Sequence, residues 1–109
     1  MYAGITISGT NAEVMPGQWE YQIGPCEGIS IGDHLWMSRY LLMRCAEEAN
    51  LVISFDPKLF EDWAGSGCHC NFSTKTMRAG TGGMKYIEEM MLRFKEKHEL
   101  HMEVYGDDN

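Results

Sequence analysis

The sequence predicts an α+β fold in which two helices pack on one face of an antiparallel sheet. Early in the chain, apolar and polar residues alternate with period two, which is typical of half-buried strands. Two later runs, roughly residues 33–49 and 84–98, repeat apolar residues at helical spacing instead. The chain of 109 residues is expected to form one domain at most, burying about 65% of its unfolded surface.

The first strands are expected to form a hairpin. Residues 3–8 read as a strand, because Ile5 and Ile7 alternate with small or polar residues, and Gly9-Thr10-Asn11 then turns the chain. Pro16 and Gly17 are the predicted turn residues. The pairs across the hairpin would then be Met15 with Gln18, Val14 with Trp19, and Glu13 with Glu20.

This register separates an apolar strand face from a polar one. The apolar face holds Ala12, Val14, Trp19, Tyr21 and Ile23, and the polar face holds Glu13, Gln18, Glu20 and Gln22. Directly opposed residues have Cβ atoms about 5 Å apart, and like charges there repel each other. Glu13 and Glu20 therefore either tolerate that cost on an exposed polar face or hold a cation, and oxygen ligands suit Mg²⁺ or Mn²⁺.

Two helices complete the predicted fold. Residues 24–32 are broken by glycines and a proline and are expected to form a loop. Asp33 is the expected N-cap of the first helix, and Asn50 ends it. Thr81-Gly82-Gly83 precedes the second helix, which begins near Met84.

Two further strands are expected between the helices. Residues 51–55 are apolar and β-branched, and Asp56-Pro57 stops them. On a strand over residues 68–74, His69, Asn71 and Ser73 would point one way and Cys68, Cys70 and Phe72 the other. The polar side of this strand lies beside the Gly65-Ser66-Gly67 loop, and it is either a ligand-contacting face or a solvated one.

Histidine and cysteine clusters also raise the question of a zinc site. Cys68-His69-Cys70 lacks the second spaced pair of ligands that structural zinc sites normally show, so we interpret these cysteines as small buried apolar residues. His98 and His101 have the helical i, i+3 spacing of metal ligands, but their place at the end of the second predicted helix favours an interaction with its C-terminus, where the partial negative charge attracts imidazolium.

Charge and hydropathy limit the function classes. The net charge of −7 argues against nucleic acid or an anionic membrane as a partner. No apolar run approaches the roughly 20 residues of a membrane span, and no export signal is seen, so a cytoplasmic location with reduced cysteines is expected.

Several motifs, in order, resemble eukaryotic-type glutamine synthetase. One is Gly9-Thr10-Asn11-Ala12-Glu13-Val14-Met15-Pro16-Gly17-Gln18-Trp19-Glu20, continuing to Gly24-Pro25-Cys26-Glu27-Gly28. The others are Phe55-Asp56-Pro57-Lys58, Gly65-Ser66-Gly67-Cys68-His69-Cys70-Asn71-Phe72-Ser73-Thr74-Lys75 and Lys85-Tyr86-Ile87-Glu88-Glu89. The resemblance runs from about Gly4 to Tyr105 and implies that residues 1–109 are the middle of that family's catalytic domain.

The resemblance implies a role for each motif. Glu13 and Glu20 match glutamates that bind metal, and His69 matches the ligand of a second metal beside the ATP γ-phosphate. The segments that touch ATP in the family correspond to Glu20, Tyr21, Gln22, Ile23, Gly24, Pro25, Asn71, Phe72 and Ser73. The glutamate-binding loop corresponds to Asp62, Trp63 and Gly65, but the family's usual Asn-Trp-Asn-Gly reads Asp62-Trp63-Ala64-Gly65 in this chain.

The implied reaction is ligation of ammonia to L-glutamate through a γ-glutamyl phosphate, with ATP as co-substrate and Mg²⁺ or Mn²⁺ as cofactor. The family's N-terminal domain, its Glu-x-Glu strand and its phosphate-binding arginines are not found in these 109 residues, so the chain by itself is expected to be inactive. A non-catalytic pseudo-subunit and a small metal- or nucleotide-binding protein are the alternatives. The family forms stacked homo-oligomeric rings, so self-association or binding to intact subunits is also expected.

Overall fold

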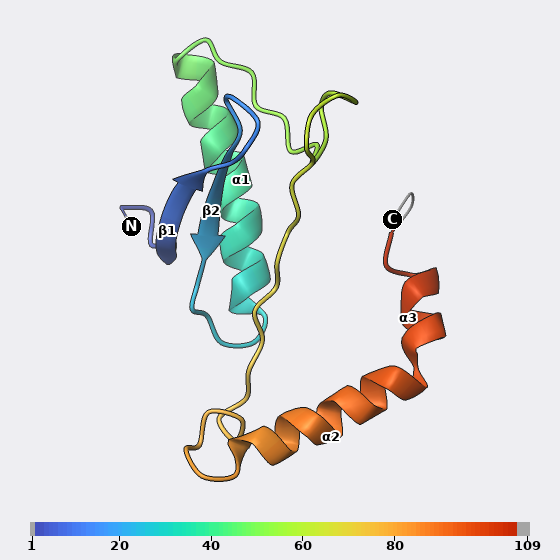
Figure 1. The fold of residues 1–109 in the computed structure, drawn as a ribbon. Helices are drawn as coiled ribbons and strands as arrows, with labels where there is room; N and C mark the ends of the chain where they lie inside the picture. Colours follow the sequence, from blue (N-terminus) through green and yellow to red (C-terminus); the bar gives the residue numbers. More distant parts are fainter. Residues whose placement is uncertain (1, 107–109) are drawn as a thin grey trace. The chain divides into compact units, whose positions relative to one another are not determined.

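The computed structural model describes residues 2–106 and confirms a small α+β arrangement. The chain divides into two compact units, residues 1–68 and 69–109. The first unit contains an antiparallel pair of strands, β1 (Ile7–Ala12) and β2 (Trp19–Ile23), and helix α1 (Ser30–Glu48) (Figure 1). The second contains helices α2 (Gly83–Glu96) and α3 (His98–Glu103). No helix among the described residues is long and apolar enough to cross a membrane.

The hairpin forms where it was expected, but its register differs by two residues. Asn11, and not Glu13, lies opposite Glu20, and Ala12 lies opposite Trp19. The turn explains the shift: the Gln18 amide donates to the Met15 carbonyl at 3.1 Å, with Gly17 at φ 78°. This φ belongs to a type II turn, which does not match the twist of a two-residue hairpin.

Val14 and Met15, which were expected to pair with β2, therefore lie in the loop. Pairing begins at Glu13, whose amide donates to the Gln18 carbonyl at 3.0 Å. A shift of two keeps every side chain on its predicted face. The separate strand expected over residues 3–8 is wrong, because β1 runs straight through Gly9-Thr10-Asn11. The register of β1 is irregular between Ile7 and Gly9, but the chain does not turn there.

Helix α1 begins three residues before the predicted N-cap. Asp33 lies in the first turn, where its carboxylate still faces the positive end of the helix dipole. The end of the helix is confirmed: Asn50 has φ 54°, its amide donates to the Glu47 carbonyl at 3.2 Å, and Leu51 donates to Ala46 at 2.9 Å. This pair of bonds is a Schellman motif, and Asn is one of the residues that accept the left-handed conformation it needs.

Helix α1 covers only one end of the apolar strand face. The Tyr21 and Ser38 hydroxyls lie 3.0 Å apart, and the Thr6 amide donates to Nδ1 of His34 at 3.2 Å. Trp19 was expected to face the core, but 71% of it is exposed, because the helix packs at the Tyr21 end of β2. Few side chains of this unit are buried, and they belong to Ile5, Met15, Ser38 and Ala46 among its described residues.

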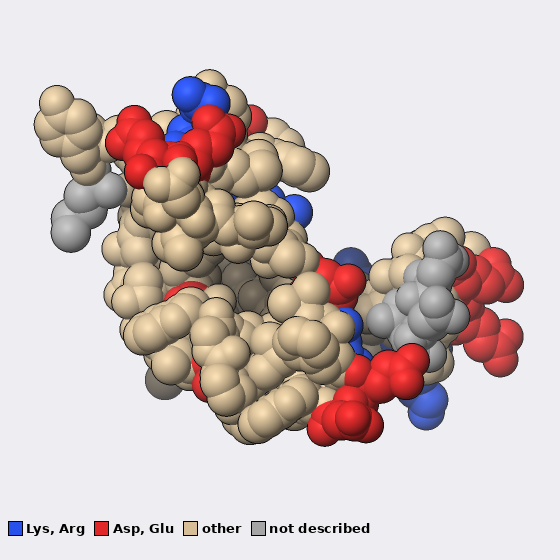
Figure 2. Space-filling view, turned by 90° about the horizontal axis from the view of Figure 1, so that it is seen from above, with Lys and Arg blue, Asp and Glu red and all other residues tan. Residues whose placement is uncertain are grey.

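Much apolar surface remains exposed. Helix α1 alone leaves Trp36, Met37, Tyr40 and Met43 at least 43% exposed. Figure 2 shows charged side chains gathered in groups on a surface that is otherwise uncharged. Exposed apolar surface of this extent is typical of interaction sites, and self-association stays a prediction.

The two strands predicted between the helices are not present: residues 51–82 contain no helix or strand. A strand requires a neighbour to accept its backbone hydrogen bonds, and none of the described residues supplies one for this stretch. The start of this stretch, at Phe55, is instead held against α1 by the side chain of Arg39. The Arg39 guanidinium lies 4.7 Å from the ring centroid of Phe55 and 5.5 Å from that of Trp36.

In the second unit, a compact turn leads into helix α2. The Met77 amide donates to Thr74 Oγ1 at 3.2 Å, and the Arg78 amide donates to the Thr74 carbonyl at 3.2 Å. Gly82 at φ 102° then redirects the chain, and Gly83 packs against the Met77 carbonyl. The helix predicted over residues 84–98 is confirmed to Glu96, and the separate helix α3 was not predicted. Packing of the second helix on the sheet stays a prediction.

We predict that Gly83→Ala lowers the stability of the second unit by about 1–3 kcal/mol, because the added Cβ would collide with the Met77 carbonyl oxygen. Amide hydrogen exchange at Arg78 and in the first turn of α2 measures the loss. Gly80→Ala is the matched control, since a Cβ added there would meet nothing within 4 Å. Equal protection in both variants would show that the close approach is not needed.

Candidate functional site

Two of the three predicted metal ligands, Glu13 and Glu20, lie on one strand face. Glu13, Gln18 and Glu20 are half-buried and alternate to the same side of the hairpin, which we call the carboxylate face. Glu13 and Glu20 are diagonal neighbours and not directly opposed, and diagonal positions are about 7–8 Å apart. The spacing reduces their repulsion, while two long side chains can still converge on one ion.

The predicted glutamate-binding loop is attached to the same hairpin. The carbonyl oxygen of Pro57 accepts from the Ser66 amide at 2.8 Å and from Nε2 of Gln18 at 3.5 Å. The first bond closes a loop over residues 57–66 that contains Asp62, Trp63 and Gly65. The second ties that loop to the carboxylate face. The structure thus brings together two predicted groups, and the link through Gln18 was not predicted.

The predicted ATP-contacting segment at Glu20–Pro25 is held by strand pairing and hydrogen bonds. The Tyr21 hydroxyl faces Ser38 of α1, Ile23 pairs with Ile7, and the Gln22 side chain accepts from the Ser8 hydroxyl at 3.4 Å. Gly24 has φ 110°, and its amide donates to the Thr6 carbonyl at 3.0 Å. A nucleotide contact from this segment would therefore come from its backbone and from Glu20, Gly24 and Pro25, with Tyr21 committed to the helix.

The other predicted ATP residues and His69 begin the second unit. His69, Asn71, Phe72 and Ser73 are exposed and do not form a strand, so the two-faced arrangement predicted for them is wrong. Ser73 is nevertheless fixed: Nη1 of Arg78 donates to its carbonyl oxygen at 3.0 Å and to its hydroxyl at 2.7 Å. That His69 opens onto the same cavity as Glu13 and Glu20 stays a prediction.

Cys68 and Cys70 were expected to be buried, and this is wrong for both. Cys45, Cys68 and Cys70 are exposed, while Cys26 is half-buried beside Nδ1 of His34 at 3.6 Å. The reason is the missing strand, which would have turned Cys68 and Cys70 toward a covered face. Over residues 2–106, no three His, Cys, Asp or Glu side chains gather closely enough to hold an ion. The carboxylate face accordingly offers part of an oxygen-ligand set, to be completed by water or further groups.

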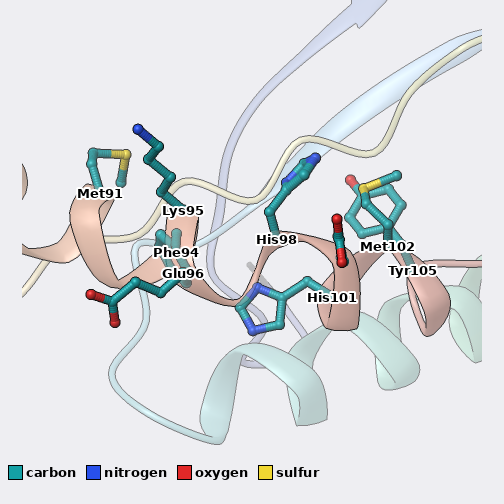
Figure 3. Close-up of a pocket in the computed structure, with 9 residues that line it drawn as sticks. Met91, Phe94, Lys95, Glu96, His98, His101, Met102 and Tyr105 are labelled. Carbon is teal, nitrogen blue, oxygen red and sulfur yellow. The ribbon is translucent and has the colours of Figure 1, made fainter.

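The second unit also has an open depression along α2 and α3 (Figure 3). Its lining residues include Phe94, His98, His101 and Tyr105. The two imidazoles point to different sides of the chain, and His101 meets Phe94 edge to face with ring centroids 5.7 Å apart. The His98–His101 spacing therefore does not form a joint metal site.

Comparison with known proteins relates the chain to one protein family. A family model described as "Glutamine synthetase, catalytic domain" matches residues 1–82. The chain belongs to the glutamine synthetase family. It is 61% identical over 110 aligned residues to the glutamine synthetases of Suillus bovinus and Agaricus bisporus, and 60% identical to that of Schizosaccharomyces pombe. These alignments cover 100% of this chain but only 30–31% of each relative's length.

We predict that Mn²⁺ binds weakly to the carboxylate face and that Glu13→Gln/Glu20→Gln lowers its affinity by about tenfold or more, because carboxylate charge sets the affinity of such sites. Titration calorimetry on the 109-residue chain gives the measurement.

The control for this titration is Glu27→Gln/Glu48→Gln, which removes the same charge from two exposed residues outside the carboxylate face. Equal affinity in the wild type and in Glu13→Gln/Glu20→Gln would mean that these carboxylates are ordinary surface acids.

Proposed function

We propose that the chain is a segment of a glutamate–ammonia ligase, which uses ATP to form glutamine through a γ-glutamyl phosphate. Membership of the glutamine synthetase family carries the proposal. The geometry supports it, since Glu13 and Glu20 share one strand face and the Pro57 carbonyl ties the loop containing Asp62, Trp63 and Gly65 to that face.

The proposed cofactor is Mg²⁺ or Mn²⁺, and the residues present fit it. Glu13 and Glu20 supply carboxylate oxygens, the donors that these ions prefer, and the family resemblance assigns His69 to a second ion. When bound, such ions neutralise charge on the transferring phosphoryl group. The protein's own part is to hold both carboxylates on one face of adjacent strands, within reach of a common ion.

ATP is the proposed co-substrate, held by Glu20, Gly24, Pro25, Asn71, Phe72 and Ser73. L-glutamate is assigned to Asp62, Trp63 and Gly65. An acidic Asp62 and an apolar Ala64 supply fewer amide donors for an α-carboxylate than the two asparagines usual in the family, so glutamate affinity is proposed to be reduced. Ammonia is the third substrate.

The proposed location is the cytoplasm, and the proposed partners are further copies or intact glutamine synthetase subunits. The exposed apolar residues of α1 support a role in assembly, because contiguous apolar surface is costly in water.

A chimera tests the proposal. The 110-residue stretch of the Agaricus bisporus glutamine synthetase that aligns with this chain is replaced by residues 1–109. We predict that the chimera forms glutamine from ATP, glutamate and ammonium, and that His69→Ala lowers the rate about a hundredfold or more, because a metal ion contributes several kcal/mol of charge stabilisation.

Cys70→Thr is the matched control in the chimera, since it restores the residue usual in the family and should leave the rate unchanged. A folded but inactive chimera that regains activity with Asp62→Asn/Ala64→Asn would favour the pseudo-subunit. A folded chimera that stays inactive with those substitutions would contradict the proposed ligase role.

We further predict that the 109-residue chain alone releases no phosphate above background from ATP in the presence of glutamate, ammonium and Mg²⁺, because it spans about 31% of its relatives' length. A phosphate-release assay with a His69→Ala control measures this. Turnover by a purified monomer that disappears in the control would contradict the prediction.

A further inference from the structure

We propose that Arg78 is a positioning residue for the nucleotide and acts through Ser73; the inference rests on the proposed function. Arg78 Nη1 carries two hydrogens and donates to both the carbonyl oxygen and the hydroxyl of Ser73, at 3.0 and 2.7 Å. Both residues are exposed, so the contact does not follow from burial of either side chain.

The local backbone holds Arg78 in reach of Ser73. Thr74 accepts from the amides of Met77 and Arg78, which closes one turn immediately after Ser73. The Met77 carbonyl packs on Gly83 at the start of α2, so the turn is anchored to a helix. This turn is an ordered part of a stretch, residues 51–82, that has no helix or strand.

The contact orients the Ser73 hydroxyl. A serine hydroxyl has one hydrogen to donate and two lone pairs to accept with. Because Arg78 occupies the oxygen as a donor, the hydroxyl hydrogen must point elsewhere, toward an approaching acceptor. A charged donor also polarises the hydroxyl and strengthens the bond that it donates. Ser73 is thereby prepared to donate to an anionic oxygen, such as a phosphate oxygen of ATP.

The charge of Arg78 is available for the same ligand. Neither ion pair found in residues 2–106, Arg44–Glu47 and Lys85–Glu89, involves Arg78. In a chain of net charge −7, a guanidinium that is held by neutral oxygens and not by a carboxylate retains its attraction for phosphate.

Titration of the 109-residue chain with ATP and Mg²⁺ tests the inference. We predict that R78M and S73A each weaken binding about tenfold, as expected for one hydrogen bond to a charged ligand. The double variant R78M/S73A should lose clearly less than the sum of the two single losses, because Arg78 acts mainly through the hydroxyl. K75M removes one positive charge from the same turn without touching Ser73 and should change the affinity less than twofold.

Each alternative outcome has a separate meaning. Wild-type affinity in R78M, or fully additive losses in the double variant, would overturn the positioning role while leaving the proposed function standing. A wild-type chain that binds no ATP would overturn the nucleotide assignment and this inference together. R78K guards against a folding artefact: it keeps the charge, and it should still bind more weakly than wild type because the shorter lysine side chain does not bring its ammonium to the position of Nη1.

Discussion

The conformation of the turn at Pro16-Gly17 determines most of the first unit. Gly17 adopts a positive φ, the Gln18 amide closes the turn onto Met15, and the ladder resumes only at Glu13. From this register follow three contacts: the shared face of Glu13 and Glu20, the reach of Gln18 to the Pro57 carbonyl, and the meeting of Tyr21 with Ser38. A turn that shifted the pairing by one residue would place Glu13 and Glu20 on opposite faces, since the side chains of a strand alternate with period two.

Local features were predictable from the sequence, while contacts between distant segments were not. Asn50 ends α1 as expected, because a left-handed C-terminal residue depends on its immediate neighbours. The strands expected over residues 51–55 and 68–74 failed because a strand depends on a partner that no local pattern reveals. The carboxylate face was predicted correctly although the register was wrong, because a shift of two residues preserves the alternation.

The candidate site was predictable to a similar extent. Glu13 and Glu20 could be placed on one strand face from alternation alone, and their metal-binding role stays a prediction from the family resemblance. The supporting contacts of Gln18 and Arg78 could not be predicted. Each joins a side chain to a main-chain oxygen, of Pro57 or Ser73, whose position is set only by folding. The exposed apolar side chains of α1 have a related cause: a helix that is apolar on several sides requires more neighbours than one two-stranded sheet provides.

The joint between the hairpin and the loop over residues 57–66 is made at a main-chain atom. The Pro57 carbonyl oxygen accepts both hydrogen bonds, and this main-chain atom is present whichever residue occupies position 57. Side-chain scanning at this position would therefore report mainly on backbone rigidity and would overlook the joint itself. Replacing the Pro57–Lys58 amide with an ester would weaken the acceptor without altering any side chain. A change in the backbone would therefore test the connection between the hairpin and the loop over residues 57–66 more directly than a side-chain substitution.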